Sequence, residues 1–151
     1  MLTLTQNRSG DKRGEHDAYG KRVVRRAAGS AFCGQGLPLR VDYDGSEAVI
    51  DGTVGGQIAL EIESRTPKQV RGAIMDLISH QFSKKLLVSL PVHHSNESSK
   101  QFTRLFRRFG ISDEHFRVIV LQGNGHEPQF ESHDVHLVRA ALYELGFSAD
   151  M

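Results

Sequence analysis

Apolar residues recur along the chain with two different periods. Four segments repeat them at the three- to four-residue spacing of an amphipathic helix. Five shorter segments alternate them with polar residues, or run almost continuously apolar as buried strands do. The predicted helices are 15–31, 66–78, 99–109 and 132–145, and the predicted strands are 39–43, 48–54, 58–63, 86–92 and 116–121.

The order of these elements is α-β-β-β-α-β-α-β-α. The runs 86–92 and 116–121 are nearly continuous in apolar residues, which is typical of central parallel strands covered on both faces. The pattern therefore predicts an α/β fold with a mixed β-sheet flanked by helices. A chain of 151 residues can bury one hydrophobic core, so we expect a single domain over residues 15–151. Residues 1–14 are polar and lack a hydrophobic period, which predicts a flexible N-terminal arm.

Two predicted helix ends carry clear capping signals. Thr66 can cap the second helix, Pro67 suits the first helical position, and Gln69 could complete a capping box with Thr66. Gly146 directly follows the last helix, where a residue with positive φ commonly ends a helix.

The hairpin formed by strands 48–54 and 58–63 can adopt two registers. A two-residue loop would place Asp51 opposite Leu60, which sets a charge against an apolar side chain. A three-residue loop, Gly55-Gly56-Gln57, instead places Ile50 opposite Ile62, Val54 opposite Ile58, and Asp51 opposite Glu61. The apolar pattern favours the second register, which gathers Asp51, Glu61 and Glu63 on one face.

Three carboxylates this close repel one another unless something compensates their charge. A hard divalent cation such as Mg²⁺ or Mn²⁺ prefers oxygen ligands and would supply that compensation. Alternate Glu residues on a strand also occur on plain solvent-facing sides, so Glu61 and Glu63 alone do not decide the matter. The Asp on the neighbouring strand is the feature that favours a metal site.

Asp51 with the later run Glu61-Ile62-Glu63 resembles the Asp…(Asp/Glu)-x-Lys signature of the restriction endonuclease-like, or PD-(D/E)xK, nuclease superfamily. The α-β-β-β-α-β order is also similar to the core of that superfamily. The run from Glu61 to Leu77, followed by KKLLVSLPVH, looks like an uncharacterised bacterial family assigned to the same fold. Glu63 stands where the signature has Lys, and no Pro precedes Asp51; some restriction enzymes of the superfamily carry Glu or Gln at the Lys position.

The resemblance implies a restriction endonuclease-like fold and metal-assisted phosphodiester hydrolysis. By the resemblance, Asp51 and Glu61 would hold Mg²⁺ (or Mn²⁺) together with the backbone carbonyl of Ile62. Glu63 would serve either as a base or as a ligand to a second metal, and these two roles stay open. Glu15 on the first helix could add a further carboxylate to the metal, as that helix does in several members, or could merely suit the helix dipole.

Polar and basic residues follow the third predicted strand and could meet nucleic-acid phosphates at a helix N-terminus. A solvated basic face explains them about as well. Arg104, Arg107 and Arg108 form a second basic stripe with the same two explanations. The first group consists of Arg65, Lys68, Gln69 and Arg71.

Composition restricts the remaining classes of function. The 19 Lys and Arg nearly balance the 18 Asp and Glu, so overall charge does not make the chain a general polyanion binder. Cys33 is the one cysteine, and the sequence carries no signal peptide or membrane-spanning run, so we expect a cytoplasmic protein without a membrane partner. A zinc site built on His93-His94 or on His133 and His136 lacks a third ligand at a recognisable spacing.

The sequence thus predicts a divalent-metal nuclease, an endonuclease or other hydrolase acting on nucleic acid and most simply on DNA. RNA is not separable from DNA by sequence, and a homodimer is possible because two strands must be cut. The alternative is a catalytically inactive nuclease-like domain that binds nucleic acid or a protein partner on the same scaffold.

Overall fold

The fold was obtained as a computed structural model, which describes residues 2–92 and 94–148, with residues 2–14 described by their backbone alone. The helices are α1 (Leu2–Ala28), α2 (Pro67–Ser79), α3 (Asn96–Arg108) and α4 (Glu131–Glu144). The strands are β1 (Phe32–Cys33), β2 (Arg40–Tyr43), β3 (Ser46–Val49), β4 (Gly52–Val54), β5 (Ile58–Glu63), β6 (Lys84–Ser89) and β7 (Phe116–Val120).

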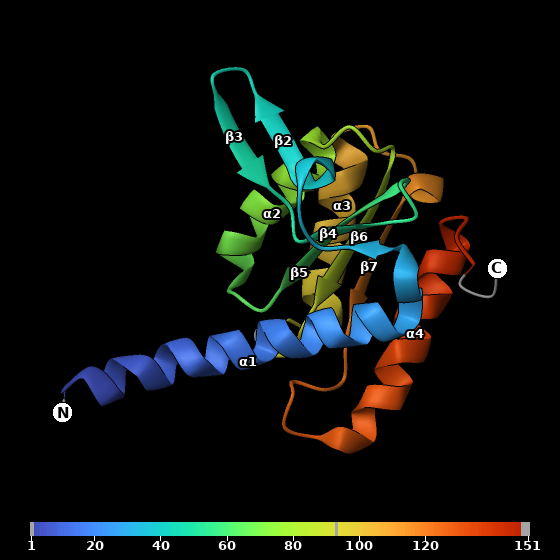
Figure 1. The fold of residues 1–151 in the computed structure, drawn as a ribbon. Coiled ribbons are helices and arrows are strands. Elements are labelled where there is room, and N and C mark those ends of the chain that lie inside the picture. Colours follow the sequence, from blue (N-terminus) through green and yellow to red (C-terminus); the bar gives the residue numbers. More distant parts are fainter. Residues whose placement is uncertain (1, 93, 149–151) are drawn as a thin grey trace.

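The main sheet has five strands in the order β1-β4-β5-β6-β7. Its first three strands pair antiparallel, whereas β5, β6 and β7 are parallel. Helices α1 and α4 cover one face, and α2 and α3 cover the other (Figure 1). The predicted α/β architecture, a mixed sheet flanked by helices, is confirmed.

Strand β5 lies at the centre of this arrangement and is buried along its whole length. Ile58, Leu60 and Ile62 pack into the core formed with α1 and α4. Ala59 packs into the second core with α2 and α3, and Glu61 and Glu63 lie on the same side of the strand, because side chains alternate. The two glutamates are therefore carried on a buried strand, close to its carboxyl end.

The segment predicted as one strand, 48–54, is divided in the structure. Residues 46–49 pair with β2 in a separate two-stranded hairpin, and residues 52–54 pair with β5. The chain changes direction at Ile50 and Asp51, so Ile50 packs in the α2–α3 core whereas Ile62 packs in the α1–α4 core. The predicted opposition of Ile50 and Ile62 is therefore wrong, although the predicted Val54–Ile58 pair and its three-residue loop are confirmed.

Helix α1 begins earlier than the hydrophobic pattern predicts. Its backbone is helical from Leu2, so it takes in residues 2–14, for which the sequence predicts a flexible arm. Once a helix is nucleated by its packed part, each further residue adds one hydrogen bond, and no proline interrupts this segment. In Figure 1 this end of α1 extends beyond the sheet.

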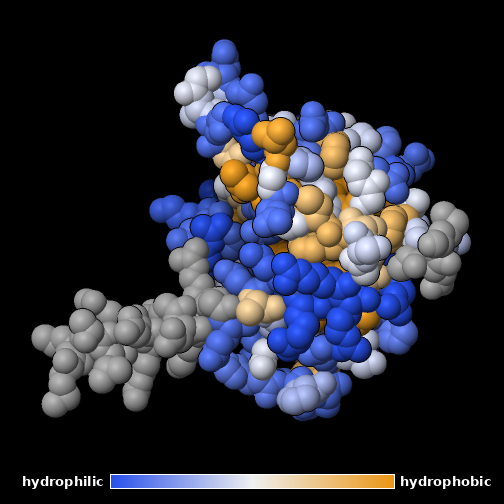
Figure 2. Space-filling view, in the orientation of Figure 1, coloured by the Kyte–Doolittle hydropathy of each residue, from blue (hydrophilic) through white to orange (hydrophobic). Residues whose placement is uncertain are grey.

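The surface over the part of α1 whose side chains are described is hydrophilic (Figure 2). No described helix combines the length and apolar character of a membrane span.

The predicted helix ends are partly confirmed. Thr66 precedes α2 and Pro67 is its first residue, as expected. The capping box does not form, because the Thr66 hydroxyl lies 3.3 Å from Gln69 Oε1 rather than accepting a backbone N–H. Gly146 follows α4 with φ +97°, the left-handed conformation that ends a helix.

Gly20 allows α1 to approach β5 closely, so the neighbouring turn of α1 lies near Glu61 and Glu63. A Cβ at this position would overlap the Ile62 side chain. We expect Gly20→Ala to lower the free energy of unfolding by about 1–3 kcal/mol, because overpacking outweighs the gain in helix propensity. Gly72→Ala is the matched control: Gly72 is also helical but has open space around it, so we expect a gain of about 0.5–1 kcal/mol. Urea denaturation of both variants measures the difference, and equal stabilisation would contradict the close packing.

Candidate functional site

A hollow of about 220 Å³ opens beside the carboxyl-terminal half of β5. Ligand sites of open α/β sheets commonly lie at the carboxyl ends of the strands. The hollow combines side chains from α1, the β3–β4 segment, β5 and α2, so four separate parts of the chain build it. Its lining residues are Asp17, Val49, Asp51, Glu61, Ile62, Glu63, Arg65 and Asp76.

Asp51 and Glu61 are brought together as the sequence predicts, and backbone hydrogen bonds fix the pair. The ladder between β4 and β5 ends at Gly52 and Leu60, so the Ile62 N–H finds its partner in Asp51 Oδ2, at 2.7 Å. In return the Asp51 N–H donates to Glu61 Oε1, also at 2.7 Å. Each carboxylate thus accepts a backbone hydrogen bond from the segment that carries the other carboxylate. The break between β3 and β4 at Asp51 allows its side chain to turn toward β5.

The electrostatic state of this pair is unusual. Burial, together with the charge of Asp51, raises the pKa of Glu61 to about 9. Burial also raises the pKa of Asp51, an effect opposed by the Ile62 N–H and by Lys21. Ionising both of two adjacent, poorly solvated carboxyl groups costs a large free energy, because burial and the like charge both oppose it. At neutral pH the pair therefore holds a proton, unless a cation takes the place of that proton.

Glu63 is in a different situation from the other two predicted site residues. Both of its oxygens accept hydrogen bonds from Arg65: the Arg65 Nε lies 2.8 Å from Oε1 and 2.9 Å from Oε2, and the Arg65 backbone N–H lies 3.1 Å from Oε2. Burial acts to raise the pKa of Glu63, but the hydrogen bonds and charge of Arg65 outweigh it and lower that pKa. The charge of the third carboxylate is thus compensated by the guanidinium of Arg65.

Two further acids line the hollow that the sequence analysis did not single out. Asp17 comes from α1, and Asp76 comes from α2, where its Oδ1 accepts a hydrogen bond of 2.6 Å from the Tyr43 hydroxyl. Glu15 is not among the lining residues; its carboxylate lies 3.3 Å from His126 Nε2 instead. Residues two apart on a helix point about 200° apart, so α1 can present only one of Glu15 and Asp17 to β5.

Only part of the group predicted to bind phosphate lines the hollow. Arg65 lines the hollow, whereas Lys68, Gln69 and Arg71 are exposed at the beginning of α2 and do not line it. The hollow therefore has five acidic side chains and a single described basic one in its lining. Such a lining attracts cations and repels bare anions.

The donors of the hollow fit a hard divalent cation in their chemistry. Asp51 and Glu61 offer carboxylate oxygens, and Ile62, whose backbone carbonyl the resemblance implies as a further ligand, also lines the hollow. The hydrogen bonds of the pair use Asp51 Oδ2 and Glu61 Oε1, and among the described residues none uses the second oxygen of either carboxylate, which could therefore bind a ligand. Within residues 15–92 and 94–148, whose side chains the structure describes, no three His, Cys, Asp or Glu side chains are arranged to hold one metal ion. The fit therefore rests on two carboxylates and not on three.

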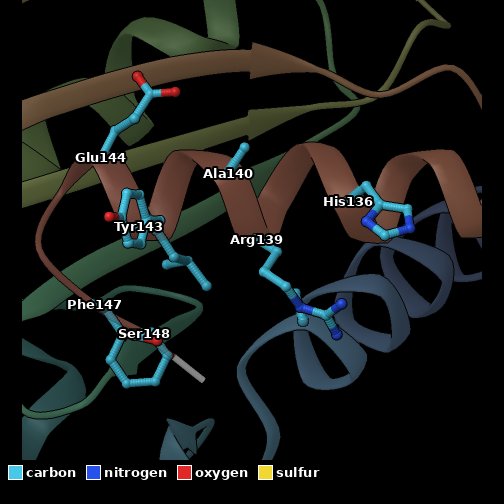
Figure 3. Close-up of a pocket in the computed structure, with 9 residues that line it drawn as sticks. His136, Arg139, Ala140, Tyr143, Glu144, Phe147 and Ser148 are labelled. Carbon is cyan, nitrogen blue, oxygen red and sulfur yellow. The ribbon is translucent and has the colours of Figure 1, made fainter. Parts of the chain in front are cut away.

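A second cavity, of about 360 Å³, lies along α4 and differs in character (Figure 3). Arg139 and Tyr143 from α4 and Phe147 from the segment after it border this cavity. Its one acidic lining residue, Glu144, is paired with Arg117 at 2.8 Å. His136 also lines it, but no zinc-type group forms there among the described residues, and His93 of the alternative zinc motif lies outside them.

Comparison of the chain with protein-family models, with curated protein sequences and with solved structures gives no significant match. Fold, hollow and side-chain chemistry therefore carry the functional argument.

Proposed function

We propose that the chain is a divalent-metal-dependent nuclease of the restriction endonuclease-like type, acting on DNA. The observation that carries the proposal is the Asp51–Glu61 pair, in which a carboxylate just before β4 and one on β5 each accept a hydrogen bond from the backbone of the other segment inside an acidic hollow. The order β4-β5-β6, with an antiparallel pair followed by a parallel one and with α2 between β5 and β6, is similar to the core that the superfamily uses.

The cation would be Mg²⁺ or Mn²⁺, held by Asp51, Glu61 and the carbonyl of Ile62. When bound, it would polarise a phosphoryl oxygen and lower the pKa of a water molecule. Asp51 and Glu61 fix its place because their own positions are fixed by the strand backbone. In the hydrolysis a water oxygen bonds to phosphorus, the bond from phosphorus to the 3′ oxygen breaks, the water gives up a proton, and the leaving oxygen gains one.

A second candidate is a nuclease-like domain that binds nucleic acid or a protein partner without cleaving it. Two observations favour it: Glu63 stands where the signature has Lys, and the described residues offer no three-ligand metal group. Binding without cleavage would still use the basic residues at the beginning of α2. The two candidates differ in whether a cation enters the hollow and in whether covalent bonds of the nucleic acid are broken.

A nicking assay separates these candidates. Purified protein is incubated with supercoiled plasmid in Mn²⁺, in Mg²⁺ and in EDTA, and a structured RNA serves as a parallel substrate. We expect nicked or linear DNA with either cation and none in EDTA, and calorimetry should show Mn²⁺ binding without any nucleic acid. Cleavage of RNA alone would change the substrate class. Gel retardation without cleavage, combined with no Mn²⁺ binding, would reject the nuclease and support the second candidate.

A further inference from the structure

The acidic hollow poses a problem for any phosphate that is to react there. Its lining carries carboxylates from α1, the β3–β4 segment, β5 and α2, and a phosphodiester is itself an anion. One divalent cation at Asp51 and Glu61 would offset two of these charges, and Asp17 and Asp76 are further acids in the same lining. A hydrolytic site usually needs a further positive group on the phosphoryl oxygens, and at Glu63 the chain has an acid where the signature has a Lys.

Arg65 is the basic residue that the described lining provides. It follows β5 by two residues, where the chain leaves the sheet for α2, and its side chain lies in the hollow beside Glu63. The Arg65 side chain is 35% exposed whereas the Glu63 side chain is 4% exposed, so the acid is enclosed and the arginine is the more accessible partner. Both residues line the hollow, and a ligand entering it would reach the more exposed arginine more readily than the enclosed acid.

The geometry of the pair fixes the direction of the guanidinium. Nε and Nη2 of Arg65 donate to the Glu63 carboxylate, and the Arg65 backbone N–H donates to the same group. A guanidinium has five N–H donors in a rigid plane, and among the described residues no hydrogen bond uses Nη1, so its donors can reach a second acceptor. Glu63 has little freedom to move, because β5 is buried between two cores. Its paired hydrogen bonds to the planar guanidinium therefore also fix the direction of the Nη1 donors.

We propose that Arg65, positioned by Glu63, contacts the non-bridging oxygens of the phosphate to be cleaved and takes over the charge-stabilising part of the role of the missing Lys. The inference rests on the proposed nuclease function. Arg65 is then a catalytic residue that donates hydrogen bonds to the developing negative charge, and it transfers no proton because an arginine stays protonated. Glu63 is a positioning residue, neither a base nor a ligand to a second metal.

The test uses the full chain and three variants. Arg65→Ala removes the guanidinium, and Glu63→Gln removes the charge that anchors it. Arg117→Ala is the matched control, because Arg117 is also a partly exposed arginine, 30% against 35%, and also pairs with a glutamate, Glu144, outside the hollow. Each protein is assayed for plasmid nicking, for Mn²⁺ affinity by calorimetry, and for binding of inorganic phosphate to the Mn²⁺-loaded form.

We expect Arg65→Ala to lower kcat by about 10²–10³-fold, as removal of one preorganised donor to a developing charge does. Phosphate binding should weaken by at least about tenfold, while Mn²⁺ affinity stays within about twofold of the wild-type value. Added guanidinium chloride at millimolar concentration should restore part of the lost kcat, and sodium chloride at equal ionic strength should not. Glu63→Gln should lower kcat by about tenfold with little change in Mn²⁺ affinity, and Arg117→Ala should match the wild type.

Three other outcomes would each overturn the proposed role of Arg65. A wild-type protein that cleaves and an Arg65→Ala variant that cleaves and binds phosphate equally well would overturn the role of Arg65 and leave the nuclease in place. Loss of Mn²⁺ affinity in Arg65→Ala would show that the arginine supports the hollow as a whole, which also overturns the proposal. A wild-type protein that neither binds Mn²⁺ nor cleaves would remove the nuclease and the role of Arg65 together.

Discussion

Glu61→Gln should abolish metal-dependent cleavage while leaving the fold intact. The amide keeps the shape of the carboxyl group, and its oxygen can still accept the hydrogen bond from the Asp51 N–H. It cannot keep the charge, so a divalent cation loses one of its two carboxylate ligands. We expect nicking in Mn²⁺ to fall by at least about 10³-fold and Mn²⁺ affinity by about 10²-fold, effects of several kcal/mol each. Plasmid nicking and calorimetry measure the two quantities on the same samples.

Glu144→Gln serves as the control for Glu61→Gln. Glu144 is also a glutamate on a regular element, but it pairs with Arg117 at the surface and does not line the hollow. Removing its charge should change nicking by less than about twofold, because an exposed ion pair contributes little. Unchanged nicking in Glu61→Gln, with the wild-type circular dichroism spectrum, would mean that the cleavage takes place elsewhere on the molecule or in a contaminant.

The hydrophobic pattern predicts the elements that pack on the large cores. The four helices and the strands β2, β5, β6 and β7 all overlap their predicted segments, because each carries regularly spaced apolar side chains that pack, fully or partly buried, on one of the two cores. Strand β1 has two residues, Phe32 and Cys33, which is too short for any period to show. The pattern also runs through Ile50 without a break, although this residue is where the chain moves from the hairpin to the main sheet.

The site could be predicted in part where it depends on one hairpin, and not where it depends on the packing of distant elements. The loop Gly55-Gly56-Gln57 sets the register of β4 and β5, and this register predicts that Asp51 lies near Glu61. It does not predict the strand break at Asp51, which gives the pair its hydrogen bonds to the backbone. Whether Asp17 or Glu15 reaches the hollow depends on the rotation of α1 against β5, which the apolar spacing fixes only within tens of degrees.

Glu63 shows a further limit of the sequence pattern. Its position in the alternation predicts its face correctly, but its chemistry is decided by Arg65, two residues later and beyond the end of the strand. Residues two apart lie on the same side only while the strand continues, so no period predicts a contact across the strand end. Buried strand acids are therefore better judged together with the basic residues of the loop that follows them.

The stability of the protein without metal should fall as the pH rises, and a divalent cation should reverse this trend. Burial and the neighbouring Asp51 raise the pKa of Glu61 from an ordinary 4.5 to about 9 in the folded chain. Between these values the folded chain keeps a proton that the unfolded chain has lost. The free energy of unfolding therefore decreases with pH, by on the order of 1 kcal/mol per unit between about pH 6 and pH 8. The slope is measured by urea denaturation in EDTA.

A bound cation replaces the proton, so Mg²⁺ should stabilise the protein more at pH 8 than at pH 6, where it must displace a tightly held proton. Glu61→Gln removes the titrating group and should flatten both the slope in EDTA and the pH dependence of the Mg²⁺ effect.

The slope is measured only up to about pH 8, because burial lowers the pKa of Lys85 to about 8. Above that value the folded chain loses the Lys85 proton before the unfolded chain does, which raises stability with pH. A wild-type slope that Glu61→Gln leaves unchanged would locate the titration elsewhere. Mg²⁺ stabilisation that is equal at both pH values would mean that the cation does not compete with this proton, and the Asp51–Glu61 pair would then not be its site.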